Sequence, residues 1–263
     1  MTRRKWMILG GVAAVAAAIV LLRLFGGGDN DKTWARIQRE GVLRVGMDAS
    51  YPPFEVVDGL GYFHGLDVDL AQALADRFGA RMEIANVGFD SLYDALRNKK
   101  FDLIISALPY DPFLRKDFAT SYSYFNAGLR WVARTEILPS LSDPGGKRVA
   151  VQLGSSADVE ARVLQRRFPQ MILLTYDEVL GVEDALARGV VDAAILDGVS
   201  AMQFAARNPE FGIGNTLLTD EPYVIAMPLD APRLKKEVNA ALVDWRESGQ
   251  LDAWVSAWVG GGH

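Results

Sequence analysis

Two short, mostly apolar runs, 101–105 and 191–196, constrain the fold of this chain most strongly. Such runs indicate strands that are buried on both faces, as in parallel sheets covered by helices. Each run ends a predicted strand–helix–strand–helix–strand series. The first series is expected at 42–46, 67–78, 81–87, 91–97 and 101–105, and the second at 148–152, 156–167, 171–175, 183–187 and 191–196. This alternation predicts an α/β protein whose parallel strands are joined by right-handed crossovers.

The two series also share a short stretch of identical residues. Asp-Ala-Leu at 94–96 precedes Asp102 at the spacing at which Asp-Ala-Leu at 184–186 precedes Asp192, 90 residues further along. One short match can arise by chance, so it supports the order of the elements without proving a duplication. The polar break at 140–146 favours two similar lobes. One large doubly wound sheet is the alternative.

The first 28 residues have the charge pattern of an exported segment. Three of the first five residues are basic, residues 6–22 are uncharged and mostly apolar, and three glycines follow at 26–28. Basic residues ahead of an apolar run predict a cytoplasmic N-terminus and export of everything after the run. The length of the run and the lack of an A-x-A motif favour an uncleaved membrane anchor. A cleaved signal peptide and a buried core helix are the alternatives, and a short helix at 31–39 is expected next.

Composition excludes several classes of site. The net charge is −5, yet the first 28 residues hold four basic and no acidic side chains, so the remainder is more acidic still. We therefore expect no nucleic-acid partner, because nucleic acid requires a basic surface. The absence of cysteine excludes disulfides, thiolate metal sites and cysteine nucleophiles. Two histidines, His64 and His263, leave little for zinc clusters or a Ser-His-Asp triad.

Ligands of open parallel sheets bind beyond the carboxyl ends of the strands, where loops and helix N-termini meet. This rule selects the residues that follow four of the predicted strands. They are Asp48, Tyr51, Pro52, Pro53, Phe54 and Glu55 after the first strand, Ser106, Ala107, Leu108, Pro109 and Tyr110 after 101–105, Gly154, Ser155 and Ser156 after 148–152, and Asp197 after 191–196.

Each candidate has a functional and a structural interpretation. The glycine and serines at 154–156 open a predicted helix whose N–H groups and dipole would attract a carboxylate or phosphate. They can equally form an ordinary serine cap. Asp197 can pair with a ligand ammonium or cap the helix that begins at Gly198. Tyr51 and Phe54 can stack on a ligand or pack in the core.

His64, Asp67 and Asp69 are expected to have structural roles. His64 lies in a turn-like stretch and is predicted to be a surface residue. Asp67 or Asp69 is expected to cap the helix that follows, without acid–base work. Near the end of the chain, an amphipathic helix is expected over 234–245, with a break at Gly249.

Four segments resemble, in order and spacing, the landmarks of one known family. They are 43–55 (LRVGMDASYPPFE), 65–70 (GLDVDL), 101–106 (FDLIIS) and 221–226 (EPYVIA). Each is weak alone, but together they are similar to the bacterial extracellular solute-binding proteins of family 3, the polar amino-acid class. The likeness runs from Leu43 to Trp258, nearly the whole exported part.

The resemblance implies an α/β, two-lobe periplasmic-binding-protein fold of type II, each lobe a mostly parallel sheet flanked by helices, preceded by an N-terminal transmembrane or signal helix. It divides the chain into a signal peptide or anchor (1–28), a linker and short helix (29–41), lobe 1 (42–132 plus 224–263) and lobe 2 (133–223). It implies an extracytoplasmic monomer without a cofactor, secreted or tethered to the membrane. The lobes would close on a small amine-bearing solute, an amino acid or derivative, for the permease of an ABC importer.

The resemblance also implies roles for the candidate residues. Tyr51 would cover the ligand side chain, Ser155 and Ser156 would hold its α-carboxylate, and Asp197 its α-ammonium. The complete predicted ligand-binding set is Asp48, Tyr51, Phe54, Phe89, Ser106, Ala107, Leu108, Arg115, Gly154, Ser155, Ser156 and Asp197.

One departure from the family affects the site. The family offers an arginine to the ligand carboxylate, but its place falls on Leu114, with Arg115 one residue away. A bidentate guanidinium–carboxylate pair is a main source of specificity. Either a shortened loop lets Arg115 serve, or the ligand lacks an α-carboxylate in the usual pose. Ala107 and Pro109 replace hydroxyl residues common in the family, which predicts a drier pocket.

Two other functions fit the same fold. One is a ligand-sensing or adaptor module without transport. The other is an enzyme resembling cyclohexadienyl dehydratase, with Glu55 or Asp111 as the candidate general acid. The missing arginine counts against the enzyme, because its substrate carboxylate must be held firmly.

Overall fold

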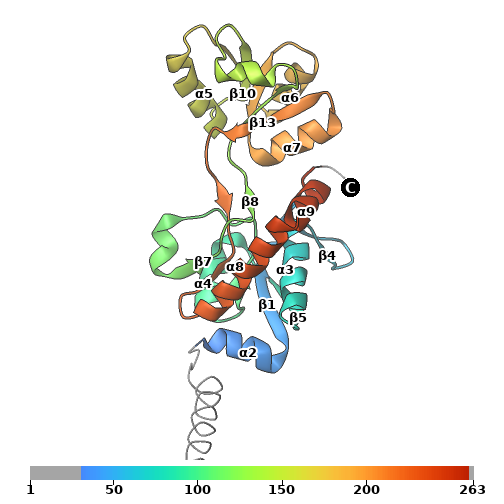
Figure 1. Ribbon diagram of the computed structural model, residues 1–263, viewed down its shortest axis with the longest axis vertical. Coiled ribbons are helices and arrows are strands. Elements are labelled where there is room, and N and C mark those ends of the chain that lie inside the picture. The colour runs from blue at the N-terminus through green and yellow to red at the C-terminus, as the bar shows by residue number, and fades with distance from the viewer. Residues whose placement is uncertain (1–30, 261–263) are drawn as a thin grey trace, which may run out of the picture.

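The structure is a computed structural model that describes residues 31–260. The predicted export segment at 1–28 lies outside the described residues. Within 31–260, none of the helices is both long enough and apolar enough to cross a membrane. The described chain forms two α/β lobes joined by a pair of strands (Figure 1).

Lobe 1 is built on a five-stranded sheet that contains the first predicted series. Its strands, in spatial order, are β5 (Arg81–Asn86), β1 (Val42–Met47), β6 (Leu103–Ile104), β15 (Ala226–Pro228) and β7 (Phe118–Thr120). β1 runs parallel to β5 and β6, whereas β15 is antiparallel to β6 and β7. The three strands of the series are therefore parallel neighbours, and β15 arrives from the far end of the sequence.

Lobe 2 repeats this arrangement with the second series. Its strands, in spatial order, are β11 (Ile172–Tyr176), β10 (Arg148–Gln152), β12 (Ala193–Leu196), β9 (Arg130–Arg134) and β13 (Phe211–Leu217). β10 runs parallel to β11 and β12, and β9 is antiparallel to β12 and β13. Because β9 belongs to this sheet, the chain crosses between the lobes before Arg130, a few residues ahead of the predicted boundary at 132.

The aspartate that repeats in the sequence has the same role in both lobes. Asp102 accepts a hydrogen bond from the Arg44 backbone N–H (2.8 Å), and Asp192 accepts one from the Arg148 backbone N–H (2.8 Å). The backbone N–H groups of both aspartates donate in return to the Arg44 and Arg148 carbonyls. The shared spacing therefore corresponds to a shared contact, which ties the last strand of each series to the first.

Helices cover both faces of each sheet. In lobe 1, the helices of one face are α2 (Lys32–Glu40), α3 (Leu66–Arg77), α8 (Pro232–Glu247) and α9 (Gln250–Trp258). The other face is covered by α4 (Leu92–Arg97), which follows the short, exposed 3₁₀ helix η1 (Phe89–Ser91). In lobe 2, α5 (Ser156–Arg167) covers one face, and α6 (Val179–Ala187) and α7 (Gly198–Arg207) cover the other. α5 has the bounds that the sequence predicts, whereas α6 begins earlier than expected.

The segment between β1 and α3 forms a small antiparallel sheet. Its strands are β2 (Ser50–Tyr51), β3 (Glu55–Val57) and β4 (Phe63–His64). His64 is exposed there, as predicted, and its Nε2 lies 3.0 Å from Asp58 Oδ2, but it belongs to a strand and not to a turn.

The start of α3 differs from the prediction. The helix follows Gly65, whose φ is +131° and where a Cβ atom would lie 2.1 Å from the Phe54 carbonyl oxygen. Asp67 is fully buried and accepts a hydrogen bond from the loop after β6, and Asp69 accepts one from Trp258 Nε1 (2.7 Å). The predicted aspartate cap is therefore wrong, because the close approach at Gly65 directs Asp67 into the interior of lobe 1.

The hinge strands, β8 (Phe125–Asn126) and β14 (Pro222–Tyr223), pair antiparallel where the chain passes between the lobes (Figure 1). The Asn126 side chain fastens these connections together. Its Nδ2 donates to Asp220 Oδ1 (2.6 Å), and its Oδ1 accepts from the Gly128 N–H (2.9 Å). The two lobes are thus linked by a narrow, hydrogen-bonded connection, a geometry that suits hinge motion.

Candidate functional site

A cavity of about 300 Å³ opens at the carboxyl ends of β1 and β6. Its lining residues are Asp48, Ser50, Tyr51, Glu55, Phe89, Ser106, Ala107, Pro109 and Tyr223. This is the position that the rule for parallel sheets predicts. Among the described residues, the lining includes two carboxyl groups and three aromatic rings but no lysine, arginine or histidine. The cavity therefore suits a ligand that brings its own positive charge.

Asp48 follows β1 and holds together the loops around the cavity. Its Oδ1 accepts from Ser50 Oγ (2.7 Å), and its Oδ2 accepts from the Phe89 N–H (2.9 Å). Its own N–H donates to Ser106 Oγ (3.0 Å). The carboxylate is half-buried, so it is fixed in place and still open to a ligand.

Glu55 lines the floor of the cavity, and Asp67 is buried beneath it. Glu55 Oε1 accepts from Ser106 Oγ (2.7 Å), and Asp67 Oδ2 accepts from the Ala107 N–H (2.5 Å) and the Tyr124 hydroxyl (2.9 Å). Burial, together with the facing Asp67 carboxylate, raises the pKa of Glu55 far above its ordinary value. Burial also raises the pKa of Asp67.

Aromatic rings form the walls. Tyr51 is 47% exposed and stacks on Phe54, with ring centroids 5.8 Å apart and planes inclined by 9°. Phe54 is fully buried and packs against Phe125 and Tyr223 of the hinge strands. Burial raises the pKa of Tyr223. Tyr51 thus offers a free ring face to a ligand, while Phe54 supports it from below.

The N-terminus of α5 already holds a carboxylate of its own chain. Ser155 caps the helix, because its Oγ accepts from the Asp158 N–H (3.3 Å) and donates to the Gln152 carbonyl (2.7 Å). The Gly154 N–H donates to Asp158 Oδ2 (3.1 Å), and this bond lowers the pKa of Asp158. Ser156 is exposed. The serine-cap interpretation is confirmed, and Asp158, which is ion-paired with Arg162 (2.8 Å), already occupies part of the anion-binding capacity of this helix N-terminus.

Asp197 caps α7. Its Oδ1 accepts from the N–H groups of Val199 (3.0 Å) and Ser200 (2.9 Å), and its Oδ2 accepts from Ser200 Oγ (2.6 Å). The capping interpretation is therefore confirmed. The half-buried carboxylate keeps capacity for one more donor, so its assignment to a ligand ammonium stays a prediction.

The structure brings together five residues of the predicted set in the cavity. They are Asp48, Tyr51, Phe89, Ser106 and Ala107. Leu108 is buried in the core around α4, and Phe54 lies beneath Tyr51. Gly154, Ser155, Ser156 and Asp197 belong to lobe 2 and do not line this cavity. Their contacts with a ligand stay predictions that require closure of the lobes.

Leu114, at the place of the family arginine, and the neighbouring Arg115 both lie outside the lining of the lobe 1 cavity. Leu114 is half-buried against the core around α4. Arg115 is exposed on η2 (Pro112–Lys116) and does not line the cavity. Binding of a ligand carboxylate by Arg115 stays a prediction.

Four lining residues lie outside the predicted ligand-binding set, namely Ser50, Glu55, Pro109 and Tyr223. Three of them neighbour predicted residues in the sequence. Tyr223 reaches the cavity because it bridges to Pro109 across more than a hundred residues. The only signal for it in the sequence is its place in the family landmark at 221–226.

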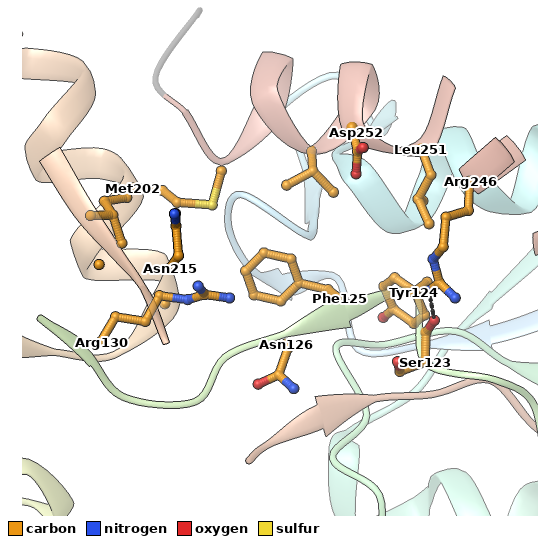
Figure 2. A pocket seen from close by; sticks show the side chains of 14 residues that line it. Ser123, Tyr124, Phe125, Asn126, Arg130, Met202, Asn215, Arg246, Leu251 and Asp252 are labelled. Carbon is orange, nitrogen blue, oxygen red and sulfur yellow. Dashed lines mark hydrogen bonds between the residues drawn. The ribbon is translucent and has the colours of Figure 1, made fainter. Parts of the chain in front are cut away.

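A second cavity, of about 390 Å³, lies between the lobes on the α8 and α9 side of the hinge strands (Figure 2). Arg130 and Asn215 enter it from lobe 2, and Asp252 lines it from α9 in lobe 1. Arg246 donates to the Ser123 carbonyl at its edge (2.5 Å). None of the predicted ligand-binding residues lines this cavity.

Comparison with known proteins agrees with this geometry. The family described as bacterial extracellular solute-binding proteins, family 3, matches residues 43–261. The arginine-binding extracellular protein ArtP of Bacillus subtilis (strain 168) is 29% identical over 264 residues, which cover 98% of this chain and 99% of ArtP.

Two solved structures are also similar. A crystal structure of a mutant of ArgBP from T. maritima is 34% identical, with a TM-score of 0.52, and the match covers 86% of this chain and 98% of that chain. A crystal structure of an ancestral cyclohexadienyl dehydratase is 25% identical, with a TM-score of 0.74, and the match covers 86% of this chain and 95% of that chain.

Proposed function

The chain belongs to the bacterial extracellular solute-binding proteins of family 3, and from this premise we propose that it captures an amino acid or derivative with a cationic side chain. The type II periplasmic-binding-protein fold and the solute-binding role in ABC import, both predicted from the sequence, are confirmed. The observation that carries the proposal is the lobe 1 cavity, which presents the Asp48 carboxylate and aromatic faces.

Electrostatics explains why the ligand supplies the positive charge. Closure of the lobes would remove water from Asp48, and a buried carboxylate without a cationic partner is costly. Each Asp48 oxygen accepts one hydrogen bond within the protein, which leaves further lone pairs for a ligand ammonium or guanidinium. The exposed rings of Tyr51 and Phe89 can add cation–π attraction to the same group. ArtP, whose name states that it binds arginine, supports this class of ligand.

Lobe 2 would complete the site on closure. We assign the α-ammonium to Asp197 and the α-carboxylate to Ser155, Ser156 and the N-terminus of α5. Because Asp158 already holds the Gly154 N–H, and because Leu114 replaces an arginine, the carboxylate would be held less strongly than the cationic end. We therefore expect affinity to depend more on the ligand's side-chain cation than on its carboxylate.

We place the protein outside the cytoplasmic membrane as a monomer, with residues 1–28 as its anchor and an ABC permease as its partner. N-terminal sequencing of the exported protein tests whether the anchor is retained. The sensor or adaptor alternative predicts a neighbouring gene for a kinase in place of a permease.

The enzyme alternative fits the cavity poorly. It is favoured by the similarity to an ancestral cyclohexadienyl dehydratase. Prephenate and arogenate carry carboxylates, however, and among the described residues the lobe 1 cavity offers them no cation. We therefore expect no turnover of either compound, and measured turnover would restore the enzyme alternative.

Thermal unfolding with a ligand panel tests the proposal. The panel contains L-arginine, L-lysine, L-glutamate, L-leucine and agmatine, which is arginine without its carboxylate. A ligand at a hundred times its dissociation constant should add about 2.7 kcal/mol of stability. We expect arginine or lysine to stabilise the protein, agmatine to retain part of the effect, and glutamate and leucine to do nothing.

A matched pair of variants locates the binding site. Asp48→Asn should weaken binding about tenfold or more, because it removes a charge-assisted hydrogen bond. Asp90→Asn, at an exposed aspartate of η1 beside Phe89, should leave binding unchanged. Stabilisation by glutamate, or equal binding by the Asp48 variant, would contradict the proposal.

A further inference from the structure

Two buried carboxyl groups under the cavity use only part of their bonding capacity. Glu55 is 1% exposed and Asp67 is 0% exposed. One oxygen of Glu55 accepts a hydrogen bond from Ser106, and one oxygen of Asp67 accepts hydrogen bonds from Ala107 and Tyr124. The remaining oxygens, Glu55 Oε2 and Asp67 Oδ1, are also buried, and no N–H or hydroxyl group of the described residues donates to them.

The two carboxyl groups are neighbours, because their partners Ser106 and Ala107 are adjacent residues and each group shifts the pKa of the other. Carboxylate oxygens only accept, so a bond between them requires a proton on one of the two groups. The titratable groups around the pair are Asp48 after β1, Tyr124 ahead of β8 and, beside Tyr124, Tyr223 on β14. None of them is a cation. Two ionised carboxylates in contact here would repel each other in the interior of the lobe.

The contacts indicate which group holds the proton. Asp67 accepts from a backbone N–H and a tyrosine hydroxyl, and both bonds favour its ionised form. Glu55 accepts one bond, from Ser106, and the Asp48 carboxylate also disfavours its ionisation.

We propose that Glu55 is a neutral hydrogen-bond donor to the Asp67 carboxylate, and that this pair positions the cavity floor and leaves Asp48 as the single negative charge that faces the ligand.

The pair acts on the cavity through a continuous series of hydrogen bonds. Glu55 orients Ser106, whose Oγ in turn accepts the Asp48 N–H. Asp67 Oδ2 accepts the Ala107 N–H. The φ of Ala107 is +40°, which is unfavourable for residues other than glycine. Glu55 and Asp67 are therefore positioning residues for Asp48, Ser106 and Ala107.

The charge state also sets specificity, and this step rests on the proposed function. A cavity with one negative charge favours a ligand end with one positive charge. Were Glu55 ionised as well, the same cavity would favour a doubly charged end. Glu55→Gln preserves the neutral state, because its amide N–H can donate to Asp67 and its carbonyl can accept from Ser106.

Infrared spectroscopy of the ligand-free protein tests the charge state directly. At neutral pH we expect the C=O stretching band of a protonated carboxyl group. Isotopic labelling of glutamate carboxyl groups should shift this band, and labelling of aspartate carboxyl groups should leave it in place. This measurement needs neither a variant nor a known ligand.

Variants test the positioning role. Glu55→Gln should abolish the band. It should keep the affinity for L-arginine within about threefold of wild type, because the hydrogen bonds remain. It should also flatten the dependence of that affinity on pH, because residue 55 no longer carries a titratable proton. Glu55→Ala should weaken binding about tenfold or more, since Ser106 loses its partner. Asp69→Asn, on the same helix but bonded to Trp258, should change neither the band nor the profile.

The outcomes separate this inference from the proposed function. Three results would overturn the assignment of the proton to Glu55. They are absence of the band at neutral pH, a band that shifts with the aspartate label, and a band that persists in Glu55→Gln. Equal binding by Glu55→Ala and wild type would overturn the positioning role. If the band behaves as expected but no cationic amino acid binds wild type, the proposed function fails and the charge assignment stands.

Discussion

Single carboxylates in this protein differ in charge state because their surroundings differ. Glu55 and Asp67 lie in the interior of lobe 1 without a cation, and burial raises the pKa values of both. Asp158 receives the Gly154 N–H, and its Oδ1 lies 2.8 Å from Arg162 Nε, so its pKa is lowered. A negative charge is therefore kept at the start of α5 and reduced under the lobe 1 cavity.

We expect the thermal unfolding midpoint to fall as the pH rises from about 5 to about 9. Because the pKa values of Glu55 and Asp67 are raised in the folded state, this state binds more protons than the unfolded chain above pH values of about 4. The stabilisation is fully present below the unfolded pKa values and is lost as the pH rises through the folded ones. Glu55→Gln should flatten the slope, with Asp69→Asn as the control. An unchanged slope in Glu55→Gln would contradict this assignment.

Two helices of lobe 1, α2 and α8, share one buried capping residue. Asp31 is 1% exposed, and its Oδ1 accepts from the Trp34 N–H in α2 (2.7 Å). Its Oδ2 accepts from the Leu234 N–H in α8 (2.9 Å), so one carboxylate caps two helices that are distant in sequence. A sequence pattern shows the first cap but not the second.

Replacement of this double cap should be costly. We expect Asp31→Ala to lower the free energy of unfolding by about 2 kcal/mol, since each cap contributes about 1 kcal/mol. Urea unfolding measures the difference. Asp177→Ala, at an exposed aspartate of lobe 2, should change stability by less than about 0.5 kcal/mol. Equal effects of the two substitutions would show that Asp31 does not cap both helices.

The elements were easier to predict from the sequence than the site. Periodicity and apolar runs located the parallel strands of both lobes and the bounds of α5, because these features follow from local burial. The cap at Asp67 was predicted wrongly, because it depends on the close approach of Gly65 to Phe54. Tyr223 and the partnership of Glu55 with Asp67 depend on contacts between distant segments, which a local pattern does not contain.

Across the whole molecule, the predicted ligand-binding residues are divided between the lobes. The lobe 1 cavity holds Asp48 and Tyr51, whereas Asp197 and the N-terminus of α5 belong to lobe 2. The narrow connection at β8 and β14 allows the two halves to meet by rotation. On this account, ligand binding and lobe closure are one event, with the charge of Asp48 as its main cause.

Small-angle X-ray scattering with and without L-arginine tests this claim most directly. Arginine should lower the radius of gyration of the wild-type protein, because the lobes close on it. At an arginine concentration near the wild-type dissociation constant, Asp48→Asn should close to a much smaller extent, and Asp90→Asn should close like wild type. Closure of Asp48→Asn to the wild-type extent, or calorimetrically measured binding of arginine to wild type without any change in the radius, would contradict the account.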